Sequence, residues 1–155
     1  MKRIPLTQGK FTLVDDKDYL ELAKYKWYAL KDGKTFYVRR MKRVKGVQKV
    51  VLMHAFILGK GCDHKNRNGL DNRRCNLRYA TRSQQQYNRS LQSNNTSGFR
   101  GVYWDRTKGK WKSAIRIKGV LKNLGYFNLA KTAARVYDRV AQQSAKEFAV
   151  LNFPR

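Results

Sequence analysis

One polar segment near the middle of the chain divides it into two parts, each of which must build its own core. The segment runs from Ser90 to Gly98 and contains one apolar residue, Leu91, and no charged residue. Serine, asparagine and glycine in such a run are typical of a flexible linker, because they bury too little apolar surface to order the backbone. The sequence therefore predicts a linker over residues 91–97 and a domain boundary there.

The first fifty residues alternate short apolar runs with turn residues. Phe11–Val14 reads as a strand, and a short helical pattern follows with Asp15 or Asp16 as its N-cap. A turn near 31–34 and another near 45–46 separate two further strand patterns. Four of the ten acidic residues lie in 15–21. They fit the first turn of a helix, where carboxylates complement the helix dipole, better than they fit a metal cluster. Residues 1–50 are thus expected to form a β-rich segment.

The central stretch, residues 51–90, combines strand, loop and helix patterns. Cys62-Asp63-His64 ends a short strand, the polar run Asn66–Asn76 reads as a loop, and Leu77–Ala80 returns as a second strand. Thr81 opens a capping-box pattern, so a helix is expected to begin at Arg82. The predicted order is strand, loop, strand and helix.

The adjacent Asp63 and His64 are the most chemically informative pair in the chain. His54 is the only other histidine, and Asp63 and Asp71 are the only carboxylates in residues 33–104. A carboxylate can hold a hard divalent cation while a neutral imidazole takes a proton from water. With arginines nearby, this pair indicates hydrolysis of a nucleic-acid backbone. His54 follows an apolar run and reads as a partly buried structural histidine, which the turn at 59–61 can bring close to His64.

The last part of the chain, from residue 98, carries a different pattern. Residues 101–105, 111–117 and 120–126 read as a three-stranded meander separated by Gly-containing turns. An amphipathic helix is expected over 129–146, with Asn128 as its cap, and it can cover one face of the sheet. The other face keeps its lysines and arginines, which suits the major groove of DNA.

The charge of the chain indicates a polyanionic partner. The formal net charge is +25, and the excess is +9 over residues 1–50, +7 over 51–100 and +9 over 101–155. Such self-repulsion opposes folding unless an anion relieves it, so a merely soluble basic surface is the weaker explanation. Double-stranded DNA is the expected partner.

Cysteine usage and hydropathy set the expected compartment. The two cysteines, Cys62 and Cys75, form no CxxC motif, which supports neither a disulfide framework nor a four-ligand zinc site. No signal-peptide core or membrane-spanning apolar run is present in the sequence. We expect a cytoplasmic protein of a bacterial or phage-infected cell, associated with DNA, with no membrane partner and no small-molecule cofactor.

The residues from about 54 to 88 resemble the HNH nucleases, specifically the homing type of phages and mobile elements. The resemblance is carried by Asp63-His64, by Asn66–Asn72 and by Asn76-Leu77-Arg78, in a loop without zinc cysteines. It implies that His64 is the general base and that Asp63 is a ligand of a divalent metal, Mg²⁺ by preference. It also implies that Asn76 either orients the histidine or stabilises the loop.

The resemblance also implies a second metal ligand on the helix that follows. The family's asparagine at that position is replaced here by Gln85, whose amide oxygen can still coordinate a hard cation. Asn88, one helical turn away, is the alternative ligand.

The final segment, residues 98–154, resembles the plant ethylene-response-factor (AP-two) DNA-binding domain. The matching residues are Arg100-Gly101-Val102, Gly109-Lys110-Trp111, Ile115-Arg116, Leu124-Gly125, Ala133-Ala134, Tyr137-Asp138 and Leu151-Asn152-Phe153-Pro154. The resemblance implies DNA contacts by Arg100, Lys110 and Arg116. Trp111 is expected in the core, whereas Trp104 is expected to be exposed. Further cationic candidates for DNA contact are Arg73, Arg74, Arg78, Arg106, Lys112 and Lys118.

Together these patterns predict an α+β protein with three parts. These are the β-rich segment 1–50, a ββα-metal (HNH) nuclease module over 51–90, and a DNA-binding domain of a three-stranded antiparallel sheet plus a helix over 98–155. The expected function is that of a metal-dependent homing-type DNA endonuclease, which nicks one strand unless two chains meet as a homodimer on DNA. Two alternatives remain open: a sequence-specific DNA-binding protein with a decayed nuclease site, and an RNA-binding protein associated with ribosomes.

Overall fold

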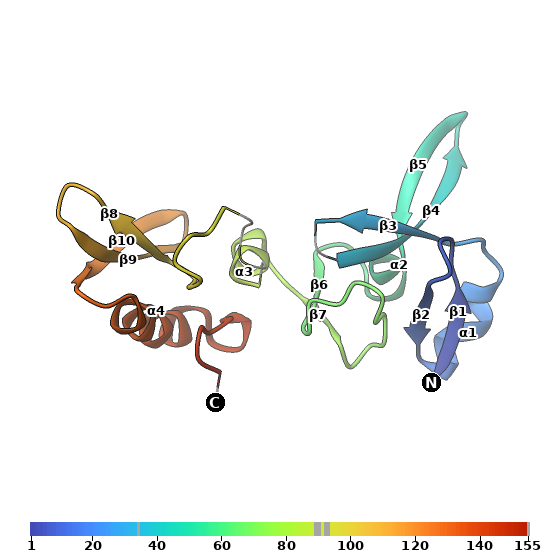
Figure 1. Cartoon of the computed structure of the whole chain (residues 1–155). Helices are drawn as coiled ribbons and strands as arrows, with labels where there is room; N and C mark the ends of the chain where they lie inside the picture. Colours follow the sequence, from blue (N-terminus) through green and yellow to red (C-terminus); the bar gives the residue numbers. More distant parts are fainter. Residues whose placement is uncertain (34, 89–90, 92–93, 155) are drawn as a thin grey trace. The chain divides into compact units, whose positions relative to one another are not determined.

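The computed structural model describes residues 1–33, 35–88, 91 and 94–154 (Figure 1). The described chain is a mixed α and β protein with four α-helices and several small antiparallel sheets, which confirms the predicted class. It forms two compact units, Met1–Thr81 and Arg82–Arg155. Parts of the predicted linker, Gln92 and Ser93, lie outside the described residues.

The first unit contains seven strands and two helices among its described residues. Its elements are β1 (Lys2–Pro5), β2 (Phe11–Val14), α1 (Asp16–Ala23), β3 (Tyr28–Asp32), β4 (Thr35–Val44), β5 (Val47–Leu52), α2 (Met53–Leu58), β6 (Cys62–His64) and β7 (Leu77–Tyr79). They pair as the antiparallel sheets β1-β2, β3-β4-β5 and β6-β7. The strand, loop and strand that the sequence predicts around His64 are therefore present as β6 and β7.

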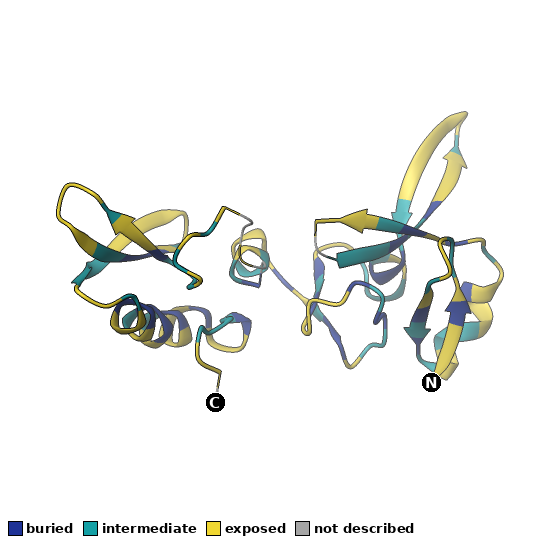
Figure 2. Ribbon diagram, in the orientation of Figure 1, coloured by how far each residue is buried: buried dark blue, intermediate teal, exposed yellow. Residues whose placement is uncertain are grey.

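The core of the first unit draws one or more side chains from most of its elements. Its buried apolar members are Ile4, Val14, Leu22, Trp27, Val38 and Met53. Figure 2 shows buried residues scattered along this unit rather than confined to one element. Burial of such side chains is the main stabilising term for a unit of this size, so the β-rich segment shares its core with α2 through Met53, and Leu70 of the loop that follows β6 packs against it.

The second unit places one helix against a three-stranded sheet. Its elements are α3 (Arg82–Tyr87), β8 (Val102–Asp105), β9 (Lys110–Ile117), β10 (Val120–Phe127), α4 (Ala130–Ala145) and a short 3₁₀ helix (Lys146–Phe148). The strand order is β10-β9-β8, and Ala133, Ala134, Tyr137 and Ala141 of α4 pack on the sheet. Gly101 is required at its position, because a Cβ there would lie 2.1 Å from the Tyr137 ring.

The helix α3 packs within the second unit. Tyr87 contacts the cluster formed by Ile115, Tyr137 and Ala141, and its hydroxyl donates a 2.9 Å hydrogen bond to the carbonyl oxygen of Arg116. The helix begins at Arg82, as the sequence predicts. The two units divide N-terminal to the predicted linker, because this tyrosine ties α3 to the sheet.

Of the two predicted helix caps, the first lies at its expected position without a capping bond, and the second is wrong by one residue. The residue at the N-cap position of α1 is Asp15, but its side chain makes no capping bond to the helix. The carboxylate accepts a 2.7 Å hydrogen bond from the backbone N–H of Arg74 instead. The N-cap of α4 is Leu129 rather than Asn128, and it makes no side-chain cap bond. Among the described residues, no helix is long and apolar enough to cross a membrane.

Candidate active site

The two short strands β6 and β7 place Asp63 and His64 beside a polar loop. Asp63 pairs with Arg78 and His64 pairs with Leu77 across the ladder. The His64 side chain faces inward and the residue is only 2% exposed. Asp63 is partly exposed, and its Oδ1 accepts a 2.9 Å hydrogen bond from the backbone N–H of His64. Alternation along a strand sends the two side chains to opposite faces.

Asn76 joins the two ends of the loop. Its Oδ1 accepts a 3.0 Å bond from the backbone N–H of Asn66, and its Nδ2 donates a 2.7 Å bond to the carbonyl oxygen of Asp71. Its own carbonyl oxygen accepts a 2.8 Å bond from the N–H of Lys65. These contacts correspond to the loop-stabilising role among the two that the sequence leaves open.

The imidazole of His64 is held by Asn72, a residue that the sequence does not single out. Its Nε2 lies 3.2 Å from Oδ1 of Asn72. The Nδ2 of Asn72 is 3.2 Å from the carbonyl oxygen of Gly69, which can only accept a hydrogen bond. Oδ1 must therefore face the histidine, and Nε2 must carry the proton. In this tautomer Nδ1 holds the basic lone pair.

The N-terminal strand β2 forms part of this arrangement. The Nδ2 of Asn72 donates a 2.9 Å bond to Oγ1 of Thr12, and that hydroxyl donates a 2.7 Å bond to the carbonyl oxygen of Leu70. The backbone of Leu13 exchanges two 2.9 Å bonds with Leu70 and Asn72. Thr12 and Asn72 are both fully buried. The β-rich segment therefore fixes the orientation of the amide that holds His64.

Two acidic residues near the start of the chain, Asp15 and Asp18, bind Arg74. Asp15 accepts the backbone N–H of Arg74, while both oxygens of Asp18 accept 2.8 Å bonds from its guanidinium. Asp16 and Asp18 lie in the first turn of α1, as the helix-dipole interpretation predicts, but the tertiary contacts of Asp15 and Asp18 with Arg74 are beyond that interpretation. Arg73 makes a similar two-bond pair with Asp71, at 2.7 and 2.8 Å, and this pair lowers the pKa of the Asp71 carboxyl. Two of the arginines predicted to contact DNA thus make intramolecular ion pairs.

The two histidines lie side by side, as the turn at 59–61 led us to expect. The ring centroids of His54 and His64 are 4.9 Å apart, and the ring of Tyr37 lies about equally far from both, at 6.0 and 5.8 Å. Burial lowers the pKa of His54 from its ordinary 6.5 to about 4, and the nearby His64 adds to this effect. Burial also lowers the pKa of His64, although Asn72 and the charges of Asp63 and Asp71 act in the opposite direction. Both rings are neutral at pH 7.

The predicted metal ligands come from both units. Asp63 lies on β6 of the first unit, whereas Gln85 lies on α3 and Asn88 follows its last residue, both in the second unit. Gln85 is partly exposed and Asn88 is buried. No cluster of three or more His, Cys, Asp or Glu side chains suited to a metal occurs among the described residues. Taken singly, the carboxylate of Asp63 and the amide oxygens of Gln85 and Asn88 are hard oxygen donors of the kind that Mg²⁺ prefers.

The cationic residues predicted to contact DNA in the second unit are mostly on its surface. Exposed members are Arg106, Lys110, Arg116 and Lys118, and partly buried members are Arg100 and Lys112. The ammonium of Lys112 lies 5.6 Å from the ring centroids of both Tyr103 and Tyr126. Arg78, on β7 of the first unit, is partly buried.

The two tryptophans of this unit take the places that the sequence predicts. Trp111 packs against the core of Val102, Ala133 and Ala134. Trp104 is 45% exposed and meets Trp111 edge to face at 5.1 Å.

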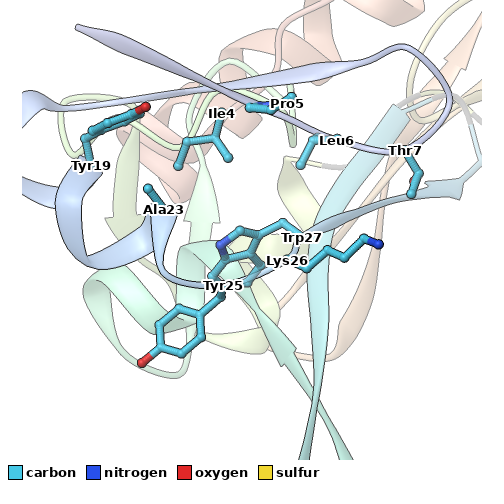
Figure 3. A pocket seen from close by; sticks show the side chains of 9 residues that line it. All are labelled: Ile4, Pro5, Leu6, Thr7, Tyr19, Ala23, Tyr25, Lys26 and Trp27. Atoms are coloured by element: carbon cyan, nitrogen blue, oxygen red, sulfur yellow. The ribbon is translucent and has the colours of Figure 1, made fainter.

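A pocket of about 430 Å³ lies elsewhere in the first unit, between β1 and the end of α1 (Figure 3). Its walls are Ile4, Pro5, Leu6, Thr7, Tyr19, Ala23, Tyr25, Lys26 and Trp27. The lining is largely apolar and includes none of the predicted site residues. The pocket is therefore separate from the candidate catalytic residues around His64.

Comparisons with known proteins agree with a nuclease. No family model matches the chain. A protein of Acanthamoeba polyphaga mimivirus, named as an uncharacterized HNH endonuclease, is 26% identical over 147 residues, which span 94% of this chain and 76% of that protein. Protein 3.8 of Escherichia phage T7 is 28% identical over 75 residues, which span 48% of this chain and 62% of that protein, less than two thirds of its length. The first similarity supports an HNH-type nuclease.

Proposed function

We propose that this chain is a metal-dependent DNA endonuclease of the homing type that nicks duplex DNA. The observation that carries the proposal is the buried contact of His64 with Asn72, next to Asp63 on the same strand. This contact sets the imidazole in one tautomer, and burial keeps the pKa of His64 below its ordinary value, so that the ring is available as a neutral base near pH 7. The similarity to a viral protein named as an HNH endonuclease points the same way.

The proposed reaction is in-line hydrolysis of one phosphodiester bond. Nδ1 of His64 takes a proton from water as the water oxygen bonds to phosphorus, and Nε2–H stays bonded to Asn72. The bond from phosphorus to the 3′ oxygen breaks, and that oxygen takes a proton from solvent water. The products are a 5′-phosphate and a 3′-hydroxyl, as the family resemblance implies. Asp63 would hold the divalent cation, Mg²⁺ by preference, and Gln85 or Asn88 would be the second ligand that the family resemblance implies. The cation would supply positive charge that offsets the charge developing on phosphate and leaving oxygen.

Sequence preference is assigned to the second unit. The outer face of its sheet carries Lys110, Lys112 and Arg116 on β9. Lysines and arginines on a sheet face can contact phosphates and base edges of a duplex. One histidine site per chain predicts a nick, and a homodimer on DNA predicts a double-strand break. The protein would act where DNA is, in the cytoplasm of a bacterial or phage-infected cell.

Plasmid nicking tests the proposal. Supercoiled DNA is incubated with wild type and with His64→Ala, with Mg²⁺ and with EDTA, and Lys31→Ala serves as a surface control. We expect relaxed circles only with wild type or Lys31→Ala in the presence of metal. Equal nicking by wild type and His64→Ala across several metals would contradict the enzymatic role.

A sequence-specific DNA-binding protein without catalysis is the second candidate. Two observations favour it: Gln85 replaces the asparagine of the family pattern, and His64 is only 2% exposed. In that case duplex DNA binds without being cut, and Gln85→Asn restores or raises nicking if the longer side chain is the cause. The first candidate predicts nicking by wild type with its glutamine in place.

A further inference from the structure

A two-stranded ribbon, formed by the distal parts of β4 and β5, projects from the first unit. We call residues 41–50 the β4-β5 ribbon. Figure 1 shows it extending away from the rest of that unit, and Figure 2 shows that nearly all of it is exposed. The register pairs Met41 with Val50, Lys42 with Lys49, and Val44 with Val47. The tip is a turn at Lys45 and Gly46, both with positive φ, of 49° and 77°.

The ribbon carries a strong and uncompensated positive charge. Its exposed cations are Lys42, Arg43, Lys45 and Lys49, and residues 33–62 contain no carboxylate. None of the ion pairs found among the described residues involves these four. Lys42 and Lys49 lie directly opposite each other, an arrangement that destabilises an isolated sheet. An anionic partner that binds both lysines would relieve this repulsion, and the relief would add to the binding free energy.

Protection of a sheet edge is the simpler explanation for such lysines, but it does not account for the ribbon. Edge strands often carry a lysine that blocks pairing with another chain. β5 is the edge of the sheet β3-β4-β5 and carries Lys49. The cations of β4 and of the turn are not needed for that purpose. Protection of the edge would also be weakened by exposed apolar residues, which favour association with another chain. These are Met41, Val47 and Val50, which are 44%, 60% and 52% exposed.

The dimensions and chemistry of the ribbon suit duplex DNA. The major groove, about 12 Å wide, accepts a two-stranded antiparallel ribbon, and thymine methyl groups provide apolar contacts there. Lysines and an arginine on both strands and at the tip can reach phosphates on either side of a groove. Among polyanions, a duplex with a groove therefore fits the mixture of cations and exposed apolar side chains.

The base of the ribbon is built into the histidine site. Tyr37, lower on β4, contacts the rings of both His54 and His64. A Cβ on Gly69 of the loop would lie 2.4 Å from the carbonyl oxygen of Phe36, so loop and strand are in close contact. β5 runs without a loop into α2, which carries His54. DNA held along the ribbon is thus held by the same rigid framework as His64.

We propose that the β4-β5 ribbon is a duplex-DNA-binding arm that enters the major groove and sets the position of the duplex relative to His64. The role in cleavage rests on the proposed function, whereas the binding itself does not. The arm is separate in sequence from the sheet of the second unit, so the chain would hold DNA at two places.

Binding of the full chain in EDTA tests the arm without requiring cleavage. Lys42→Gln combined with Lys49→Gln removes two charges while keeping polar side chains of similar length. The matched control, Lys17→Gln with Lys31→Gln, removes two exposed charges elsewhere in the first unit. Anisotropy of a labelled 30-base-pair duplex is followed as the salt concentration rises, and thermal melting checks that both variants fold.

We expect the ribbon variant to bind at least tenfold more weakly at low salt. The slope of log K against log salt should fall by about 1.8, because each lost phosphate contact contributes about 0.9. The control should match wild type. A folded ribbon variant with unchanged affinity and slope for the duplex would overturn the proposal. The same titration with RNA or anionic vesicles is the comparison, and a loss of affinity for these alone would also overturn it. Duplex binding through the ribbon by a wild type that does not nick would instead contradict the proposed function alone.

Discussion

The proposed chemistry depends on how a single residue, His64, is held. The pair Asp63-His64 stands out in the sequence, because one of the two histidines directly follows one of the two carboxylates in residues 33–104 of a strongly basic chain. Asn72 and Thr12 could not be recognised. They are 60 residues apart in the chain and meet only in the fold, and Asn72 is one of several asparagines in its loop. No local pattern distinguishes the one that contacts the imidazole.

Replacing Asn72 tests the tautomer assignment. Asn72→Ala leaves Nε2–H of His64 without this acceptor, so we expect single-turnover nicking to fall by roughly 10² to 10⁴, the usual range for a misplaced general base. Asn72→Asp keeps an acceptor but adds a negative charge that raises the pKa of His64. It should therefore recover part of the rate and move the acid limb of the pH profile upward. Equal loss in both variants with identical pH profiles would argue for a purely structural role.

His54 predicts a pH dependence of stability. Its pKa is about 4 in the folded chain against 6.5 ordinarily, so the unfolded state binds the proton more readily. The contribution of the neutral His54 ring to the free energy of unfolding is complete above pH 6.5. It is lost as the pH falls from 6.5 towards 4. Between pH 7 and pH 5 this amounts to about 2 kcal/mol. Urea unfolding at both pH values should show that His54→Gln loses less stability than wild type; equal losses would contradict it.

At the element scale, the strands and helices were largely predictable, whereas their mutual contacts were not. Alternating apolar residues and turn signals located β6, β7, β8, β9 and β10, and the helical period located α4. The acids of residues 15–18 predict local helix chemistry, because the sequence shows only local neighbours. In the fold, Asp15 and Asp18 also anchor Arg74 from the far end of the loop. Charged side chains commonly find such distant partners once burial makes an unpaired charge costly.

The anchor on α1 gives an element-scale prediction. Asp18→Asn removes one charge from the two-bond pair with Arg74, in which Asp18 is 15% and Arg74 38% exposed. After allowance for solvent screening, we expect a loss of about 1 kcal/mol in the free energy of unfolding. Asp32→Asn, at an exposed position, is the control and should change stability by less than about 0.5 kcal/mol. Urea titrations with indistinguishable midpoints for both variants would show that the pair contributes nothing.

At the scale of the whole molecule, charge and core placement explain what the chain can do. Positive charge in every third of the chain predicted a polyanionic partner, and the fold exposes much of it on the β4-β5 ribbon and on the sheet of the second unit. The grouping of α3 with the second unit was beyond prediction, because it depends on Tyr87 reaching the cluster around Ile115. The helix α3 follows β6 and β7 in the sequence, but its Tyr87 packs in the core of the second unit, with the sheet β8-β9-β10.

Mapping the cut ends on a randomised DNA library tests the central claim most directly. Wild type and His64→Ala are incubated with the library and Mg²⁺, and new 5′ ends are sequenced from both strands. We expect 5′-phosphate ends that recur at one sequence on one strand, only with wild type and only with metal. Ends no more frequent or more focused than those left by His64→Ala would contradict it.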